Sequence, residues 1–227
     1  SGGTIIAWKN AHSIAGNGIR IVGAHTDSPG LHIKPNPDTR TLNWHQLQVE
    51  VYGGPLLNSW LDRDLGIAGH VVLRDGSTSL FASQLPVARI PQLAIHLDRE
   101  VNDKGLILNR HQHLTPIWAT TASSVSFESW LAQQVSVSAS QIASWSAQLV
   151  DTQKAQIIGR DSEFVASSRI DNQISCWAAL LALLDVDSDQ PMMIALFDHE
   201  EVGSQSSQGA GGPMLEHALE RLSVAAG

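Results

Sequence analysis

The residues whose types and spacing could do chemistry form a short acidic run near the carboxyl end of the chain. Phe197 to Ser204 reads Phe-Asp-His-Glu-Glu-Val-Gly-Ser, and it follows the apolar run Met192 to Leu196. The apolar run is typical of a buried strand, and ligands bind at the carboxyl ends of strands in open α/β sheets. Glu200 and Glu201 are adjacent, so their side chains point in different directions. One carboxylate could hold a metal while the other acts on a water.

A glutamate pair at the end of a strand is, by itself, more often a solvated pair of acids, so the interpretation depends on residues elsewhere. His25 and Asp27 follow a second predicted strand, Ile19 to Ala24, before Pro29 and Gly30 break the chain. They lie on the same side of an extended chain. A metal-bound histidine commonly has a carboxylate partner that fixes its tautomer. The pair therefore predicts a metal ligand and its partner, although the spacing is common by chance.

A further carboxylate stands where a helix should begin. Asp171 precedes the run Gln173 to Leu184, which is apolar nearly all round and predicts a buried helix. Asp171 is well placed either as the N-cap of that helix or as a carboxylate that bridges two cations. His25, Asp171, Glu200 and Glu201 provide one imidazole and three carboxylates, a set that suits two divalent cations sharing a water.

The elements that must position these residues have an α/β texture at both ends of the chain. Thr4 to Trp8 and Ile19 to Ala24 predict two strands, and Gly16-Asn17-Gly18 between them predicts a hairpin. From Lys34 to about Val150 the sequence instead predicts a β-rich module inserted between two α/β pieces. Within it we expect short apolar segments and one helix, at His45–Val51, Gly69–Leu73, Pro86–Ile90, Leu106–Leu108 and, for the helix, Ser126–Gln134.

Other features of the insert favour structural roles. Most of its tryptophans should lie in the core. Asp62-Arg63-Asp64 predicts an internal ion pair or an interface rather than a catalytic site. His111 and His113 have the spacing of a metal pair on a strand, but few acids lie near them, so we interpret them as polar surface residues.

Composition excludes several classes of protein. The 227 residues are 43% hydrophobic and 16% charged, which indicates a folded chain with a substantial core. The formal net charge of −8 argues against nucleic-acid binding. The sequence shows neither an apolar run of about 20 residues nor a signal peptide, so we expect no membrane insertion. Cys176 is the only cysteine, which excludes an internal disulfide framework and favours a small buried residue in a cytoplasmic protein.

Three familiar catalytic motifs are missing. The sequence contains neither a phosphate-binding glycine loop nor the Gly-x-Ser-x-Gly of serine hydrolases. The one-helix zinc protease motif would need a second histidine four residues after His199, and Gly203 stands there. These absences leave nucleotide chemistry and the serine-hydrolase and one-helix zinc protease classes without support.

Taken together, these segments resemble the M18 metallopeptidases, the aspartyl aminopeptidase family. The resemblance runs nearly the full length of the chain, and it rests on seven blocks: Gly23–Pro29, Val51–Gly54, Trp60–Gly66, Leu93–Leu97, Asp151–Ala155, Arg169–Gln173 and Phe197–Ser204.

The resemblance implies a fold and an assembly. It implies an α/β fold with a mixed sheet flanked by helices, the co-catalytic zinc peptidase fold, formed by residues 1–30 and 152–227. Residues 31–151 would form an inserted β-rich dimerisation domain, in a homo-oligomer that we expect to be a dodecamer built from dimers. His96 matches a family histidine of the inserted domain that reaches the active site of a neighbouring subunit and binds substrate.

The resemblance also implies the role of each site residue. Carried over by position, His25 is a ligand of one metal, Asp171 bridges both metals, and Glu201 is a ligand of the other. Glu200 is the general base, and Asp27 orients His25. The cofactors would be two divalent ions, zinc first, with manganese or cobalt as alternatives.

The expected reaction is removal of one N-terminal residue from a peptide. Glu200 would take a proton from a water activated by the two metals and pass it to the leaving amine. The family name implies a preference for Asp or Glu. Two alternatives stay open: a related metallopeptidase or deacylase of the M42 or M28 type, and a non-catalytic assembly subunit, against which the intact set of acids argues.

Family members are longer than this chain, and their remaining Asp and His ligands match nothing up to Gly227. We therefore interpret the chain as a fragment, which alone should bind metal weakly and show no turnover.

Overall fold

The computed structural model describes residues 2–14 and 18–225. The chain divides into two compact units, which we call the split unit (Ser1–Pro29 and Ser167–Gly227) and the inserted unit (Gly30–Ala166). The inserted unit thus ends at Ala166, whereas the sequence placed that limit at residue 151. That the units are a metallopeptidase domain and a dimerisation domain stays a prediction.

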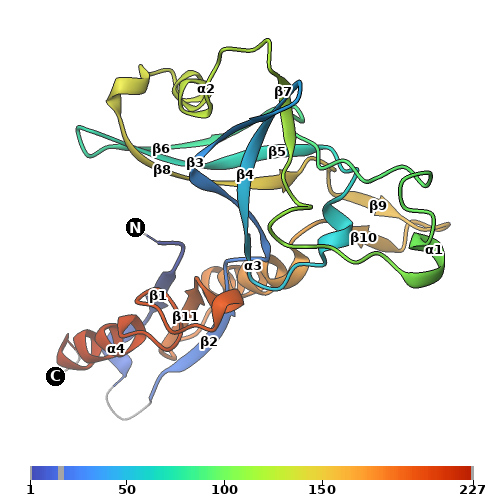
Figure 1. Ribbon diagram of the computed structural model, residues 1–227. Coiled ribbons are helices and arrows are strands. Elements are labelled where there is room, and N and C mark those ends of the chain that lie inside the picture. The colour runs from blue at the N-terminus through green and yellow to red at the C-terminus, as the bar shows by residue number, and fades with distance from the viewer. Residues whose placement is uncertain (1, 15–17, 226–227) are drawn as a thin grey trace. The chain divides into compact units, whose positions relative to one another are not determined.

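The sheet of the split unit is built around its most apolar strand. Among the described residues its strand order is β1 (Ile5–Lys9), β11 (Met192–Phe197), β2 (Arg20–His25), with β11 antiparallel to β1 and parallel to β2 (Figure 1). The predicted strands are confirmed, but the predicted hairpin is wrong because β11 lies between β1 and β2. Residues 16 and 17 of its turn lie outside the described residues. The central place goes to β11, whose residues from Met193 to Phe197 are buried.

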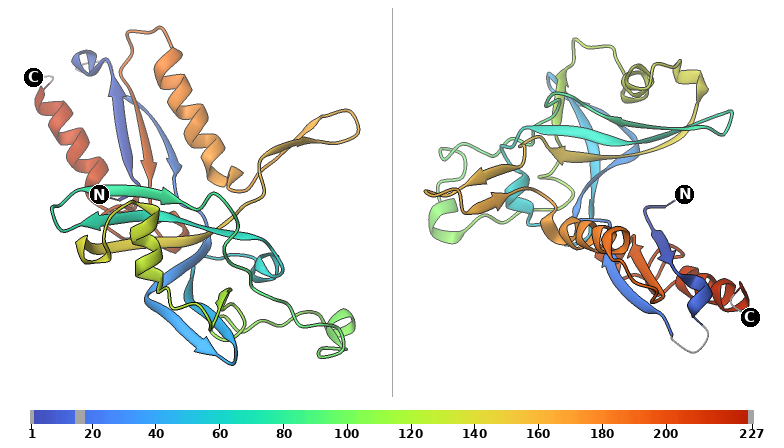
Figure 2. Two further views of the ribbon diagram at one scale, coloured as in Figure 1. Left: turned by 90° about the horizontal axis from the view of Figure 1, so that it is seen from above. Right: turned by 180° about the vertical axis from the view of Figure 1, so that it is seen from behind.

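The helices of the split unit are α3 (Ile170–Asp185) and α4 (Met214–Ala225), with 3-10 turns η1 (Ala11–Ser13) and η4 (Glu200–Val202). Figure 2 shows α3 running along the sheet, and its Cys176, Ala179 and Leu183 pack with Ile194 and Leu196 of β11. The predicted helix and the burial of Cys176 are confirmed. Full burial of the helix is not: its other face, including Trp177 and Leu184, is exposed within this chain.

The inserted unit is an antiparallel sheet with the strand order β6-β5-β8-β3-β4-β7 over the residues the structure describes. A separate hairpin pairs β9 with β10. The strands are β3 (Gly30–Thr41), β4 (Trp44–Tyr52), β5 (Leu65–Leu73), β6 (Thr78–Ala82), β7 (Ile117–Thr120), β8 (Ile142–Asp151), β9 (Gln156–Ile158) and β10 (Phe164–Ala166). Its helices and 3-10 turns are η2 (Leu57–Trp60), α1 (Val101–Lys104), α2 (Phe127–Gln134) and η3 (Ala139–Gln141).

The predicted elements of the insert are largely present. The strand at His45–Val51, the one at Gly69–Leu73 and the helix near Ser126–Gln134 are confirmed as β4, β5 and α2. Pro86–Ile90 contributes only isolated bridges, from Ala88 to Leu65, from Arg89 to Ile117 and from Ile90 to Leu61, and the first two connect β5 to β7. The sheet thereby forms a closed circuit of backbone hydrogen bonds. Leu106–Leu108 lies outside the strands of the described chain.

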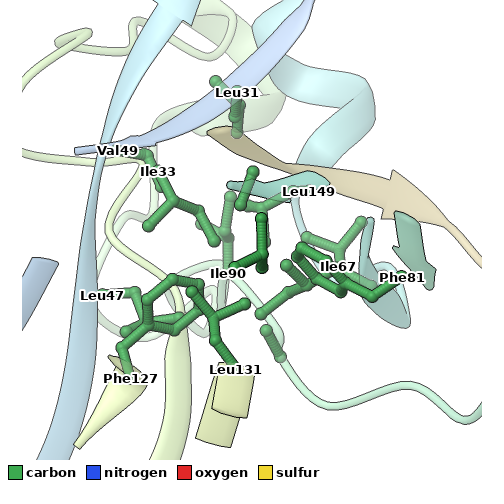
Figure 3. Close-up of a cluster of buried hydrophobic side chains, with 14 of the residues drawn as sticks. Leu31, Ile33, Leu47, Val49, Ile67, Phe81, Ile90, Phe127, Leu131 and Leu149 are labelled. Carbon is green, nitrogen blue, oxygen red and sulfur yellow. The ribbon is translucent and has the colours of Figure 1, made fainter. Parts of the chain in front are cut away.

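The core of the inserted unit fills this circuit (Figure 3). It gathers side chains from β3, β4, β5, β6, β8 and α2, among them Leu31, Ile33, Leu47, Val49, Ile67, Phe81, Phe127, Leu131 and Leu149. Four tryptophans pack against this core, namely Trp60, Trp118, Trp130 and Trp145, whereas Trp44 is exposed. The predicted role of most tryptophans is therefore confirmed.

Asp62, Arg63 and Asp64 all form ion pairs within the chain, as one of the two alternatives predicted, and the interface alternative stays a prediction. Arg89 contacts Asp62 at 3.6 Å and Asp64 at 2.6 Å, and Arg63 pairs with Asp151.

No helix in the described part of the chain is long and apolar enough to cross a membrane.

One part-buried polar contact fastens α2 to this sheet. His45 of β4 is 1% exposed, and its Nε2 lies 2.7 Å from Oδ1 of Asp38. The same carboxylate accepts the backbone N–H of Phe127, at 3.0 and 3.2 Å, at the start of α2. This carboxylate therefore joins β3, β4 and the start of α2. Its loss would leave the buried donors of His45 and Phe127 unsatisfied, which is costly.

We predict that Asp38→Ala lowers the free energy of unfolding by about 1–3 kcal/mol, the cost of leaving a buried donor without its partner. Asp38→Asn, which keeps an acceptor oxygen, should lose less. Urea unfolding followed by tryptophan fluorescence would measure both. Equal losses for the two variants would show that the hydrogen bonds contribute little.

Candidate metal centre

The chemistry-bearing residues meet where two parallel strands end. His25, the last residue of β2, is in register with Phe197, the last residue of β11. The backbone N–H of Thr26 donates to the carbonyl of Phe197 at 2.7 Å, so the pairing continues one residue beyond the strands. The loops that carry Asp27 and the glutamate pair therefore leave the sheet side by side.

The imidazole of His25 is held in one orientation. Its Nδ1 lies 3.0 Å from the backbone carbonyl of Asp27 and 3.5 Å from Oδ1 of the same residue. Because a carbonyl only accepts, Nδ1 carries a proton, and Nε2 is the ring nitrogen that can ligate a metal. Cys176 of α3 donates from Sγ to the backbone carbonyl of His25 at 3.0 Å. These contacts aim Nε2 away from the sheet and towards the acids.

Asp27 has a second set of contacts that the sequence did not predict. Its carboxylate accepts the backbone N–H groups of Glu200 and Glu201, both at 3.2 Å, and its side chain is only 7% exposed. Such contacts satisfy amide groups at the start of the short turn η4. One buried carboxylate thus links the histidine of β2 to the acids that follow β11.

Side-chain atoms of three predicted site residues form a compact group. The Nε2 of His25 and one carboxylate oxygen each from Glu200 and Glu201 lie within 4.8 Å of one another. Asp171 lies at the same nitrogen, with Oδ1 3.2 Å from Nε2, and its side chain is 90% exposed. The structure therefore brings together all four residues of the predicted set around the imidazole of His25.

The backbone of Asp171 is fixed before α3 becomes regular. Asp171 and Asn172 have non-helical φ and ψ, and the peptide bond between them is cis. Ser28 donates from Oγ to the carbonyl of Asp171 at 3.2 Å, and Gln173 donates from Nε2 to the carbonyl of Thr26 at 2.6 Å. The N-cap position belongs to Arg169. Of the two sequence interpretations of Asp171, the geometry favours a carboxylate aimed at the metal site.

The electrostatics of the group reflect crowded acids. Burial lowers the pKa of His25, but the carbonyl of Asp27 and the charges of Glu200, Asp27 and Asp171 outweigh it, so the pKa lies above its ordinary value of 6.5. Burial, and then the charge of Glu200, raises the pKa of Glu201 above its ordinary value of 4.5. The shift of His25 reflects the acids around it, whereas that of Glu201 comes first from burial and only then from the neighbouring Glu200.

The residues present fit a divalent cation. One imidazole nitrogen and several carboxylate oxygens within bonding reach of a common point are the donors that zinc takes in catalytic sites. A cation would also favour the charged form of Glu201, whose pKa is raised by burial and then by the charge of Glu200.

The remaining predicted site residue lies in the other unit. His96 is exposed on a turn of the inserted unit, so a role beside the acids stays a prediction. His111 and His113 are exposed as predicted, and Nδ1 of His113 accepts the backbone N–H of Asn109 at 3.0 Å.

Comparison with known proteins agrees with this geometry. The family model described as "Aminopeptidase I zinc metalloprotease (M18)" matches residues 1–227. The chain belongs to the M18 family. It is 45% identical over 234 residues to "Probable M18 family aminopeptidase 2" of Streptomyces coelicolor, covering 100% of this chain and 54% of that protein. It thus spans about half the length of the curated M18 relatives it matches.

Solved M18 structures share the fold. Chaetomium thermophilum mApe1 superposes with a TM-score of 0.85 at 33% identity, over 96% of this chain and 54% of that one. The S. cerevesiae mApe1 dodecamer superposes with a TM-score of 0.78 at 27% identity, over 98% and 53%. The predicted α/β peptidase fold is therefore confirmed.

We predict that His25 stabilises the metal-free protein more at low pH than at high pH. Since its folded pKa is raised, the protonated form is favoured by folding, and the gain is complete below 6.5 and lost as pH rises through the folded pKa. In excess chelator, the difference in melting temperature between wild type and His25→Gln should shrink as pH increases. A difference that grows with pH would contradict the prediction.

Proposed function

We propose that the whole protein is a zinc-dependent aminopeptidase that removes one N-terminal residue from peptides. One observation carries the proposal: His25, Asp171, Glu200 and Glu201 converge at the adjoining ends of β2 and β11. This is the predicted ligand and base set, in a chain of a zinc metalloprotease family.

The proposed centre holds two divalent ions, with manganese or cobalt as alternatives to zinc. His25 and Glu201 would each ligate one ion, and Asp171 would bridge the two. A bound ion would supply the Lewis acidity that activates water and polarises the scissile carbonyl. The exposure of Asp171 leaves its second oxygen free for another ligand. The match with half of each relative's length leaves room for further ligands in the rest of the protein.

Glu200 is the proposed general base, and its surroundings support this role over that of its neighbour. Its side chain is 53% exposed, whereas Glu201 is half-buried and has its pKa raised by burial. A base must reach the water whose proton it takes, and the more exposed carboxylate does so. Glu200 would then return the proton to the leaving amine.

The substrate and the assembly complete the proposal. The acids around His25 suit the free α-amine of a peptide, and the family name suggests Asp or Glu at that position. N-terminally blocked peptides should be refused, which separates this activity from a deacylase. A homo-oligomer, namely a dodecamer built from dimers through the inserted unit, is proposed by analogy with the S. cerevesiae mApe1 dodecamer. A cytoplasmic location stays a prediction.

We predict that Glu200→Gln in the full-length protein lowers kcat by roughly 10²–10⁴-fold, the scale of a general base, while metal content is kept. Glu201→Gln should instead release one metal. Turnover of aspartyl and leucyl anilides, with metal analysis of the same samples, would test both. Metal loss in Glu200→Gln and retention in Glu201→Gln would exchange the two roles.

We predict that His96→Ala lowers activity without changing bound metal, because the proposal places it at a neighbouring subunit's site. Mixed oligomers of His96→Ala and Glu200→Gln subunits should regain part of the activity, since each subunit supplies what the other lacks. No recovery in verified mixed oligomers would argue against a shared site. His111→Ala, at another exposed histidine of the same unit, should leave activity unchanged.

A further inference from the structure

A hydrogen bond between His199 and Ser206 closes the loop that carries both glutamates. The Nδ1 of His199 and the Oγ of Ser206 are 2.6 Å apart, and both side chains are half-buried. We propose that these two residues form a positioning pair for Glu200 and Glu201. The inference deepens the proposed function and rests on it.

The contacts of Ser206 determine the direction of this hydrogen bond. Its Oγ accepts the backbone N–H groups of Gln208 at 3.2 Å and Gly209 at 3.1 Å. A hydroxyl oxygen has two acceptor positions and one proton. With both acceptor positions taken, the proton of Ser206 goes to Nδ1 of His199, which is the acceptor.

His199 controls both carboxylates because it immediately precedes them. Its backbone is left-handed, with φ of 62°, at the start of η4. Its carbonyl accepts the N–H of Ser204 at 2.9 Å, and the carbonyl of Ser204 accepts the N–H of Gly211 at 3.0 Å. A rotation at His199 would therefore move Glu200 and Glu201 together, and the bond to Ser206 opposes that rotation.

The loop has little room to take another shape. A Cβ on Gly209 would lie 2.2 Å from the carbonyl oxygen of Ser204, so glycine is needed for this close approach. On the other side, Asp27 holds the N–H groups of Glu200 and Glu201. The acids are thus supported at two places, by Asp27 beside His25 and by Ser206 behind His199.

A serine and a histidine in contact, with Asp198 nearby, resemble a catalytic triad, but the geometry opposes that role. The Nε2 of His199 is 3.9 Å from Oδ2 of Asp198, beyond hydrogen-bond distance. The carboxylate of Asp198 accepts the N–H of Gly3 and of His199 instead, both at 2.9 Å. The oxygen of Ser206 is occupied by two donors and is not available as a nucleophile.

The test compares matched variants of the full-length protein. Ser206→Ala should lower kcat about 10–100-fold, the range for groups that support ligands and bases, with KM changed less than about threefold. Ser206→Thr keeps the hydroxyl and should retain most of the activity. Ser207→Ala, at the exposed neighbouring serine, is the control and should match the wild type.

His199 is tested in the same way. Asn tolerates left-handed φ, and its side-chain oxygen can take the place of Nδ1, so His199→Asn should retain most of the activity while His199→Ala loses it. The double variant His199→Ala/Ser206→Ala should be no worse than His199→Ala alone, because residues that act as a pair are not additive.

Zinc titration by calorimetry gives a readout that does not need turnover. Ser206→Ala should bind zinc about 10–100-fold more weakly than wild type and Ser206→Thr. Wild type that binds zinc but cleaves no peptide would refute the proposed function, and the zinc arm would still decide the positioning role. Unchanged kcat and zinc affinity in Ser206→Ala, loss of both without rescue by threonine, or a change only in melting temperature would each overturn that role.

Discussion

The site depends on the parallel pairing of β2 with β11. In a parallel pair both strands end at the same edge of the sheet, so the register of His25 with Phe197 brings the loops after them together. A slip of one residue would turn His25 to the opposite face of the sheet. The register is itself fixed by burial, because Ile194 and Leu196 of β11 pack on α3 with Ala24 of β2. The packing that forms the core of the split unit therefore also sets the geometry of the candidate site.

The sequence was informative where a local pattern decides the structure. The apolar run before Phe197 predicted β11, and the acids after it were placed at the carboxyl end of a strand, as found. The run after Asp171 predicted α3, and the alternation in the insert predicted β4. The site residues followed from the order of several weak motifs, and the structure brings His25, Asp171, Glu200 and Glu201 together.

Local patterns failed where the partner lies far along the chain. A Gly-Asn-Gly turn between two short strands is a sound hairpin signal, yet residues of β11, far along the sequence, separate β1 from β2. The contact of Asp27 with the N–H groups of Glu200 and Glu201 spans more than 170 residues, and so no spacing rule reveals it. Because α3 is apolar nearly all round, it was predicted to be buried on all sides. In the described chain only one face of the helix is buried.

The acids of the site differ in burial, and the degree of burial determines which role suits each of them. Asp27 is nearly buried, and its oxygens face the N–H groups of Glu200 and Glu201 and the imidazole of His25. The Asp27 carboxylate is therefore suited to holding these groups in place. Asp171 and Glu200 are largely exposed at the same imidazole, so their oxygens remain accessible to the cation and the peptide that the proposal requires. Glu201 lies between these extremes, and its raised pKa is the cost of being partly buried beside another carboxylate. A cation would remove that cost and favour the charged form of Glu201. The acid proposed to position His25 and the acids proposed to react thus differ in their surroundings, although all are carboxylates within one small group.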